Sequence, residues 1–290
     1  MSSLKTHEVG NIGVVTLARA HKRNALDDAT IQEIDDYFSN VPSHIRVIVM
    51  MAEGDHFCAG LDLKEHHDQE RGAVEFLRVC RAWHRAFDKI QHGGVPVIAC
   101  LQGAVVGGGL ELASAAHIRV ADASTYFSLP EGTRGIFTGG GATVRTARIL
   151  SADRIIEMML TGRVMGIEEG HRLGLAHYVC NTPENPVSAQ DYAMSLAERI
   201  AQNAYLSNYA IVTSINKIAD MSATDGLFAE GLMAAVVQTG HDVQSRLNDF
   251  VTKRAPKVKP GESAVEQAQG TATPGSDTAM QDQDTARQGG

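Results

Sequence analysis

The sequence lacks the features that mark several classes of protein. No apolar run reaches the roughly 18 residues that a membrane-spanning helix needs, and residues 1–7 contain no apolar segment typical of a secretion signal. The four cysteines form no CxxC pair, which argues against a zinc ribbon and against a disulfide framework. A net charge of −8 argues against a broad nucleic-acid-binding surface. We therefore expect a reduced, cytoplasmic protein with neither a membrane nor a nucleic acid as its partner.

The end of the 290-residue chain is poor in large apolar side chains. Residues 255–290 contain no Leu, Ile, Phe, Tyr or Trp. Such a segment cannot bury enough apolar surface to offset the entropy that is lost on ordering. We therefore predict a disordered tail over 255–290 and a folded part that ends near residue 254.

Short apolar runs and helical patterns alternate along the first half of the chain. Five runs are expected to form strands, at 13–17, 46–51, 96–101, 117–121 and 125–128. Apolar residues at helical spacing predict helices over 31–38, 72–91 and 110–116. This alternation predicts an α/β fold with mostly parallel strands. From about residue 141 the pattern is helical, and the last helix is expected to cover roughly 223–250.

Three consecutive glycines, Gly107 to Gly109, stand between an expected strand and an expected helix. Glycine lets a backbone approach a ligand closely, and the start of a helix presents unpaired N–H groups that suit a phosphate or a developing oxyanion. The spacing matches neither GxGxxG nor GxxxxGK[ST], and GxSxG is absent, so nucleotide-binding and serine-hydrolase interpretations are disfavoured. A tight packing turn is the alternative interpretation.

Two further segments change the interpretation of the glycines. Residues 57–65 contain small residues that can place a second backbone N–H at the edge of a site, although a simple turn would have the same composition. Glu131 lies on a loop shortly before another glycine run at 139–141. Two N–H donors together with Glu111 and Glu131 suit a reaction in which an acyl carbonyl is polarised while protons move at the neighbouring carbons.

At these residues the sequence resembles the crotonase (enoyl-CoA hydratase/isomerase) superfamily, from about residue 13 to residue 254. The segments that carry the resemblance are 22–26, 57–64, 107–113 and 130–141. The resemblance implies a spiral of repeated ββα units over residues 1–200 and a helical trimerisation region over 201–254. It also implies assembly into a homotrimer, or into a homohexamer made of two trimers.

The resemblance also implies an activity and a set of site residues. The thioester carbonyl of an acyl-CoA would accept hydrogen bonds from the backbone N–H groups of Leu61 and Gly108. Glu111 and Glu131 would hold the water that adds across the 2,3 double bond of a 2-enoyl-CoA. CoA is part of the substrate, and neither a separate cofactor nor a metal is expected. Contacts with substrate or CoA are implied for Lys22, Arg23, Ala25, Ala59, Asp62, Leu63 and Gly107, with Lys253 and Arg254 as weaker candidates.

Departures from the family pattern leave the acyl group open. Thr138 stands where hydratases often have proline, residues 132–134 are more polar than usual, and His117 replaces a common aspartate. Trp83, His84 and Phe87 lie where an acyl pocket is often lined, but Trp83 and Phe87 are four residues apart and favour ordinary core contacts. His66 and His67 point in different directions on a helix, so a solvated face is favoured over a metal site.

Several activities remain compatible with these residues. The leading hypothesis is an enoyl-CoA hydratase of fatty acid or aromatic acid metabolism. The alternatives are a feruloyl-CoA-like hydratase/lyase, which would release an aldehyde and acetyl-CoA, and an enoyl-CoA isomerase. A scaffold that binds acyl-CoA or RNA without catalysis is disfavoured, because binding alone does not need both glutamates.

Overall fold

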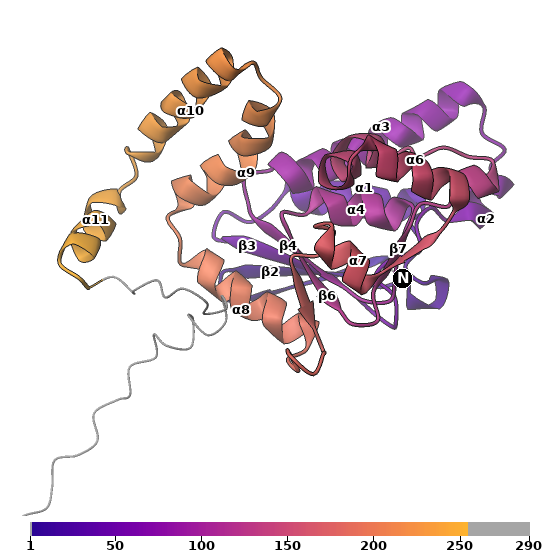
Figure 1. Ribbon diagram of the computed structural model, residues 1–290, viewed down its shortest axis with the longest axis horizontal. Helices are drawn as coiled ribbons and strands as arrows, with labels where there is room; N and C mark the ends of the chain where they lie inside the picture. Colours follow the sequence, from indigo (N-terminus) through magenta and orange to yellow (C-terminus); the bar gives the residue numbers. More distant parts are fainter. Residues whose placement is uncertain (1, 255–290) are drawn as a thin grey trace, which may run out of the picture.

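The computed structural model describes residues 2–254 and is built on two sheets (Figure 1). The predicted tail over 255–290 lies outside the described residues. The larger sheet has the strand order β1-β2-β3-β4-β6-β9, with β1 (Leu4–Val9), β2 (Ile12–Leu17), β3 (Val47–Ala52), β4 (Val97–Leu101), β6 (Ile118–Asp122) and β9 (Tyr178–Cys180). Only the β1–β2 pair is antiparallel in this sheet. The smaller sheet contains β5 (Ala104–Val106), β7 (Tyr126–Ser128) and β8 (Val164–Gly166).

Helices cover both faces of the larger sheet, which explains why its central strands are apolar along their whole length. Val15, Ile48 and Met50 pack on the face covered by α1 (Asp28–Ser39), α3 (Ala73–His92) and α4 (Gly108–Ala115). The alternate residues Val14 and Val49 pack against α8 (Ala189–Ala201) on the opposite face. The structure therefore confirms the α/β class with mostly parallel strands.

Shorter helices lie between the strands along the chain, and the last of them leads from β8 of the smaller sheet to β9 of the larger sheet. These are α2 (Leu63–Asp68), α5 (Ala147–Leu150), α6 (Ala152–Thr161) and α7 (Ile167–Arg172). A π-helical turn over Ala142–Thr146 leads directly into α5. Among the described residues, no helix is both long enough and apolar enough to cross a lipid bilayer.

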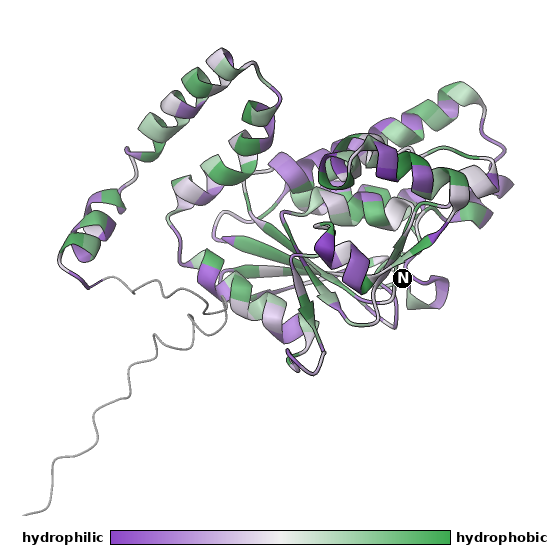
Figure 2. Ribbon diagram, viewed as in Figure 1, coloured by the Kyte–Doolittle hydropathy of each residue, from purple (hydrophilic) through white to green (hydrophobic). Residues whose placement is uncertain are grey.

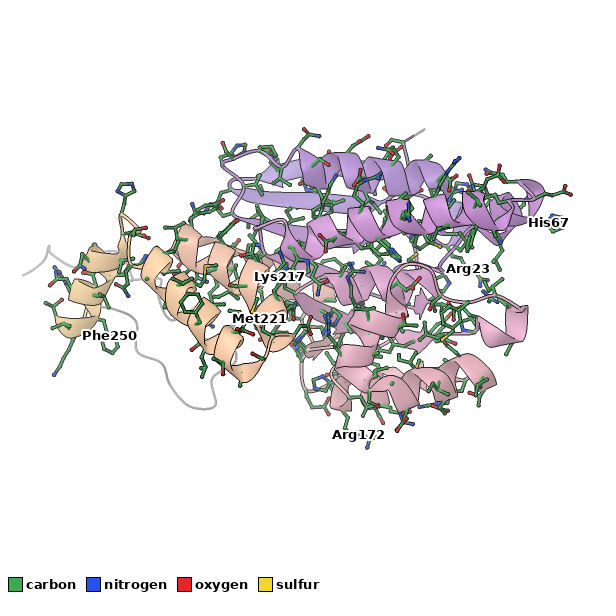
Figure 3. The ribbon with its side chains drawn as sticks, turned by 90° about the horizontal axis from the view of Figure 1, so that it is seen from above. Arg23, His67, Arg172, Lys217, Met221 and Phe250 are labelled. Atoms are coloured by element: carbon green, nitrogen blue, oxygen red, sulfur yellow. The ribbon has the colours of Figure 1, made fainter. Side chains whose placement is uncertain are left out.

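The chain continues from α8 into an arm of three helices, α9 (Tyr205–Ala219), α10 (Ala223–Val237) and α11 (Val243–Val251). Figures 1 and 3 show α10 and α11 extending away from the two sheets, and Figure 2 shows apolar residues along them. The expectation of one helix over 223–250 is wrong, because α10 and α11 are separate. Gly240, which has a low helix propensity, lies in the turn between them, and its N–H donates to the carbonyl of Val237.

Candidate active site

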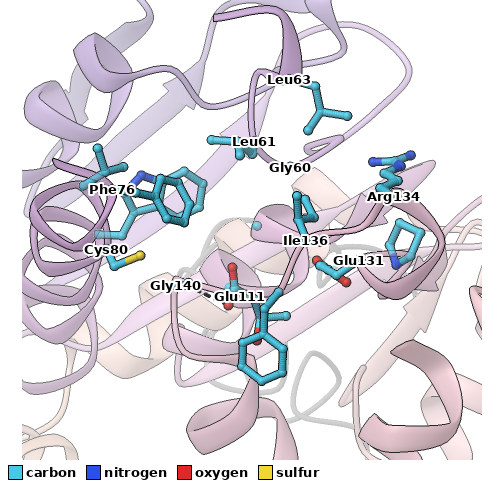
Figure 4. Close-up of a pocket in the computed structure, with 18 of the residues that line it drawn as sticks. Gly60, Leu61, Leu63, Phe76, Cys80, Glu111, Glu131, Arg134, Ile136 and Gly140 are labelled. Carbon is cyan, nitrogen blue, oxygen red and sulfur yellow. Dashed lines mark hydrogen bonds between the residues drawn. The ribbon is translucent and has the colours of Figure 1, made fainter. Parts of the chain in front are cut away.

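A pocket opens beside the N-terminus of α4 (Figure 4). It encloses about 540 Å³ between its walls, including the part that is open to solvent, which is in the usual range for a small-molecule site. The walls come from α3, the segment before α2, the start of α4 and the loop after β7. Most of the lining is apolar, and two carboxylates stand in it, from Glu111 and Glu131.

The backbone N–H groups of Leu61 and Gly108 lie at the same point of the wall. A Cβ added at Gly108 would be 3.4 Å from the nitrogen of Leu61, and a Cβ added at Gly60 would be 3.1 Å from the nitrogen of Gly108. Gly60 has a φ of +94°, a conformation that favours glycine. Within residues 2–254, neither of these two N–H groups donates a hydrogen bond to the protein. Both are therefore available to a carbonyl oxygen.

Three segments are joined by backbone hydrogen bonds that hold this point in place. The N–H of Leu26 donates to the carbonyl of Gly60 at 2.7 Å, and the N–H of Asp62 donates to the carbonyl of Leu26 at 2.9 Å. On the other side, the N–H of Val106 donates to the carbonyl of Cys58 at 3.1 Å. The segment at 22–26 thus supports the position of Leu61, which explains why it accompanies the two glycine-containing segments in the sequence.

Glu111 lies in the first turn of α4 and is only 3% exposed. Its Oε1 accepts hydrogen bonds from the N–H of Gly140 at 2.8 Å and of Ala142 at 2.9 Å. Burial raises the pKa of this carboxyl, while the N–H groups of Ala142, Gly140 and Gly141 oppose the rise because they stabilise the charged form. One oxygen of Glu111 is therefore held rigidly by the loop that faces α4.

Glu131 lies at the start of the loop after β7 and is 6% exposed. Its Oε2 is buried and has no hydrogen-bond partner among the described residues. Burial raises the pKa of Glu131 to about 7, and the charge of Glu111 adds to the rise while Arg134 opposes it. This carboxyl can therefore exchange a proton near neutral pH, which is what a general acid or base requires.

The residues expected to contact CoA occupy different places. Ala59, Leu63 and Gly107 line the pocket, and Gly107 has a φ of +53° that favours glycine. Ala25 is buried, and its carbonyl accepts a hydrogen bond from Arg19. These four therefore belong to the pocket or to the backbone that supports it.

Asp62 is held in an ion-pair network beside the pocket. Its carboxylate lies 2.9 Å from Nη2 of Arg19, and the same nitrogen lies 2.9 Å from Asp27. Burial opposes ionisation of Asp62, but the hydrogen bonds from Arg19 and from the N–H of Glu65 keep its pKa below the usual range. Asp62 also caps the start of α2. In this structure its contacts are with protein groups that shape the loop.

The basic residues expected near CoA are widely separated within one chain. Lys22 and Arg23 are exposed, and Nζ of Lys22 lies 4.0 Å from Asp62. Figure 3 places Arg23 and Phe250 of α11 at opposite ends of the protein. Lys253 and Arg254 follow α11 directly, so one chain does not bring them close to Lys22, and neither Lys22 nor Arg23 lines the pocket of Glu131.

The departures from the family pattern have different structural settings. Trp83 lines the pocket and also contacts Phe87 edge to face, with ring centroids 5.5 Å apart. Phe87 is fully buried behind it, and His84 is exposed. Only Trp83 of these three therefore borders the pocket. Thr138 also lines it, and its hydroxyl is buried without a hydrogen-bond partner among the described residues.

Three histidines that stood out in the sequence lie outside the pocket. His117 accepts a hydrogen bond from the N–H of Val97 at 3.0 Å, and burial lowers its pKa to about 4, so it is neutral. His66 packs against Phe76 with ring centroids 4.9 Å apart, while His67 is exposed. Among residues 2–254, no cluster of His, Cys, Asp or Glu is suited to hold a metal ion.

Sequence reasoning missed Arg145, which supports the loop that contains Gly140. Its Nη1 donates to the carbonyl of Gly140 at 3.1 Å, and its Nε donates to the side chain of Gln91 at 2.7 Å. Gly140 in turn donates its N–H to Glu111. Arg145 stands in the π-helical turn, and its spacing from Glu111 follows no local period, so the sequence contains no signal that would have found it.

Comparisons with known proteins agree with this geometry. The profile of the family described as enoyl-CoA hydratase/isomerase matches residues 7–260. Human enoyl-CoA hydratase domain-containing protein 2, mitochondrial, is 30% identical, with 84% of each chain covered. The mitochondrial Delta(3,5)-Delta(2,4)-dienoyl-CoA isomerase of Dictyostelium discoideum is 26% identical over 86% of this chain and 87% of its own. Both names place those proteins in mitochondria, so the cytoplasmic location of this chain stays a prediction.

Solved structures show the same fold. A candidate enoyl-CoA hydratase from Rhodopseudomonas palustris CGA009 superimposes with a TM-score of 0.82 and 46% identity, over 89% of this chain and 97% of its own. The enoyl-CoA hydratase of Bacillus anthracis gives a TM-score of 0.80 and 26% identity, over 89% and 99% of the two chains. The expected crotonase-like architecture is therefore confirmed, together with a helical C-terminal region.

Proposed function

The chain belongs to the enoyl-CoA hydratase/isomerase family, and from this premise we propose that it is an enoyl-CoA hydratase. The observation that carries the proposal is the position of two buried carboxylates, Glu111 and Glu131, in the wall of one pocket with the N–H groups of Leu61 and Gly108. Two positioned carboxyls can bind and activate a water molecule, which simple acyl-CoA binding does not require.

The proposed reaction uses each group for a separate task. The thioester oxygen accepts hydrogen bonds from Leu61 and Gly108, which stabilise the negative charge that develops on that oxygen. Water is held between the two carboxyls, its oxygen forms a bond to C3, and the electrons of the double bond move toward the thioester. A proton is then added at C2, which completes the hydration.

The electrostatics suggest which glutamate does which task. Burial raises the pKa of Glu111, but the two backbone N–H bonds to one of its oxygens oppose that rise and favour the ionised form that takes a proton from water. Burial raises the pKa of Glu131 to about 7, so it can hold a proton near neutral pH. We assign Glu111 as the base toward water and Glu131 as the acid toward C2.

The direct test follows the enoyl thioester absorbance with crotonyl-CoA and then with an aryl-propenoyl-CoA. We expect the absorbance to fall and the product mass to increase by one water. Release of an aldehyde and acetyl-CoA from the aryl substrate would instead support the hydratase/lyase alternative. An unchanged spectrum and an unchanged mass with both thioesters would contradict a hydratase.

An isomerase is the second candidate, because one relative is named a dienoyl-CoA isomerase and two carboxyls can also move a proton between carbons. The product mass separates the two activities, since isomerisation leaves it unchanged.

We also propose that the arm of α9 to α11 forms the subunit contacts of a homotrimer or homohexamer, because most of its large apolar side chains are exposed in one chain.

A further inference from the structure

A second cavity lies between α9 and the end of α4, and three arginines line it. It encloses about 880 Å³ between its walls, including the part that is open to solvent. Arg119 comes from β6, Arg145 from the π-helical turn and Arg148 from α5, while Asn216 and two isoleucines of α9 form the opposite wall. Among the described residues, no aspartate or glutamate lines this cavity.

Arg119 and Arg145 are hydrogen-bonded to neutral groups, whereas Arg148 is paired with Asp220. Arg119 is 5% exposed and donates hydrogen bonds to the carbonyl oxygens of Ala116, Gly174 and Leu175. Burial lowers the pKa of this guanidinium to about 10, and among the described residues its hydrogen-bond partners are all backbone carbonyls. The guanidinium is therefore fixed in orientation while its charge remains uncompensated.

Arg145 and Arg148 both line the cavity, and each keeps nitrogens that have no hydrogen-bond partner among the described residues. Arg145 uses Nε and Nη1 for Gln91 and Gly140, and its Nη2 has no hydrogen-bond partner among the described residues. Arg148 is paired with Asp220 at 2.6 Å through Nη2 alone. Burial lowers the pKa of Arg145 and the charge of Arg148 adds to the lowering, while the charges of Asp88 and Glu111 oppose it. The cavity thus combines positive charge with unused N–H donors.

We propose that this cavity is a binding site for a small phosphate-class oxyanion. Guanidinium groups recognise phosphate and other oxyanions through paired hydrogen bonds, and three arginines line this cavity with no lining carboxylate among the described residues. The site is separate from the pocket of Glu131, so it does not depend on the reaction proposed above. Helix α4 borders both sites, with Glu111 in the pocket and Ala115 in the cavity, and Arg145 joins them through the carbonyl of Gly140.

The experiment measures binding of inorganic phosphate to the full chain by calorimetry and by thermal unfolding, against chloride at equal ionic strength. We expect about one phosphate per chain, with a rise in Tm that chloride does not give. Asn216→Asp keeps the shape of the side chain but places a carboxylate in the cavity. It should weaken phosphate binding roughly tenfold or more, because the new carboxylate and a phosphate in the same cavity repel each other. Arg148→Gln removes one donor and should weaken binding about tenfold.

Two control variants make the same chemical changes outside the cavity. Asn248→Asp on α11 and Arg172→Gln on α7 are at exposed positions, and phosphate affinity should remain that of the wild type. Equal losses in the controls and in the cavity variants would overturn the proposal, as would a wild type with no phosphate-specific effect. If Asn216→Asp lowers the oligomer mass and the wild type binds no phosphate, a second copy fills the cavity and the proposal is wrong.

Discussion

The core and the C-terminal arm are both rich in apolar residues, but only the core buries them within one chain. All five residues of β4 are buried, because successive side chains of that strand meet helices on both faces of the sheet. In α10 only Gly226 is buried, while Leu227, Phe228 and Leu232 are more than half exposed. The core therefore buries its own apolar surface, whereas the arm needs a partner surface to cover its exposed apolar side chains. Catalytic changes should act in the core, and changes of assembly should act in the arm.

The largest effect is expected at the two glutamates. Glu131→Gln and Glu111→Gln should each lower turnover by roughly 10²–10⁴, the usual contribution of a positioned acid or base. The variants keep the size of the side chain, so fold and oligomer mass should match those of the wild type. The check is the rate of loss of enoyl thioester absorbance together with light scattering. A variant with near-normal turnover would remove that glutamate from the mechanism.

Gly108→Val should have the next largest effect, a loss of about 10²–10³ in turnover if one oxyanion donor is displaced. A Cβ at this position would lie 2.5 Å from the ring of Trp83, so either the loop or the ring must move. Gly166→Ala in strand β8, where an added Cβ meets nothing within 4 Å, serves as the control. A correctly assembled Gly108→Val with the wild-type rate would show that the proposed carbonyl site is wrong.

The glutamates and the glycines were predictable because each stands in a short segment with its own pattern. Gly107 to Gly109 interrupt an apolar sequence, and Glu131 follows proline and precedes glycine. The strands β3 and β4 were predictable for a similar reason, since they are buried on both faces. The edge strand β1 was missed because it is exposed along most of its length and carries polar residues.

Other features depend on contacts that no local pattern contains. Arg145 acts through Gly140 and Gln91, which come from different parts of the chain. The raised pKa of Glu131 arises from burial in the folded protein. The break between α10 and α11 was also missed, because apolar residues on both sides of Gly240 continue a helical pattern.

The arm is tested by Phe228→Asp. Phe228 is 70% exposed in one chain, and burying a phenylalanine stabilises an interface by about 1.5–3 kcal/mol. A charge there should therefore dissociate the oligomer, and light scattering should detect the lower mass. Val9→Asp changes an exposed apolar residue of strand β1, outside the arm, and should leave the oligomer mass unchanged. A wild type that is monomeric at every concentration would refute the proposed role of the arm.

The free energy of unfolding should depend on pH through Glu131, which lies in the two-sheet part of the protein and not in the arm. Burial raises the pKa of Glu131 from 4.5 to about 7, so the folded state holds this proton more tightly than the unfolded state. The resulting stabilisation is fully present below pH 4.5 and is lost as the pH rises through 7. Between pH 4.5 and pH 8 the wild type should lose on the order of 1–3 kcal/mol more than Glu131→Gln. Denaturant unfolding of both proteins at one protein concentration measures this, and parallel pH profiles would contradict it.

The smallest effect, and the sharpest probe of the arm, is expected for Gly231→Ala on α10. Within one chain an added Cβ meets nothing within 4 Å, and alanine in an exposed helix interior is more favourable than glycine by about 0.5–1 kcal/mol. We therefore expect a slightly higher Tm at unchanged oligomer mass. Gly226→Ala lies on the same helix, but its added Cβ would be 3.3 Å from the carbonyl of Ile218, so its gain should be smaller or absent. If Gly231→Ala instead lowers the mass, another subunit approaches the backbone of α10 closely at this residue. That result would locate the partner surface which the exposed side chains of the arm require.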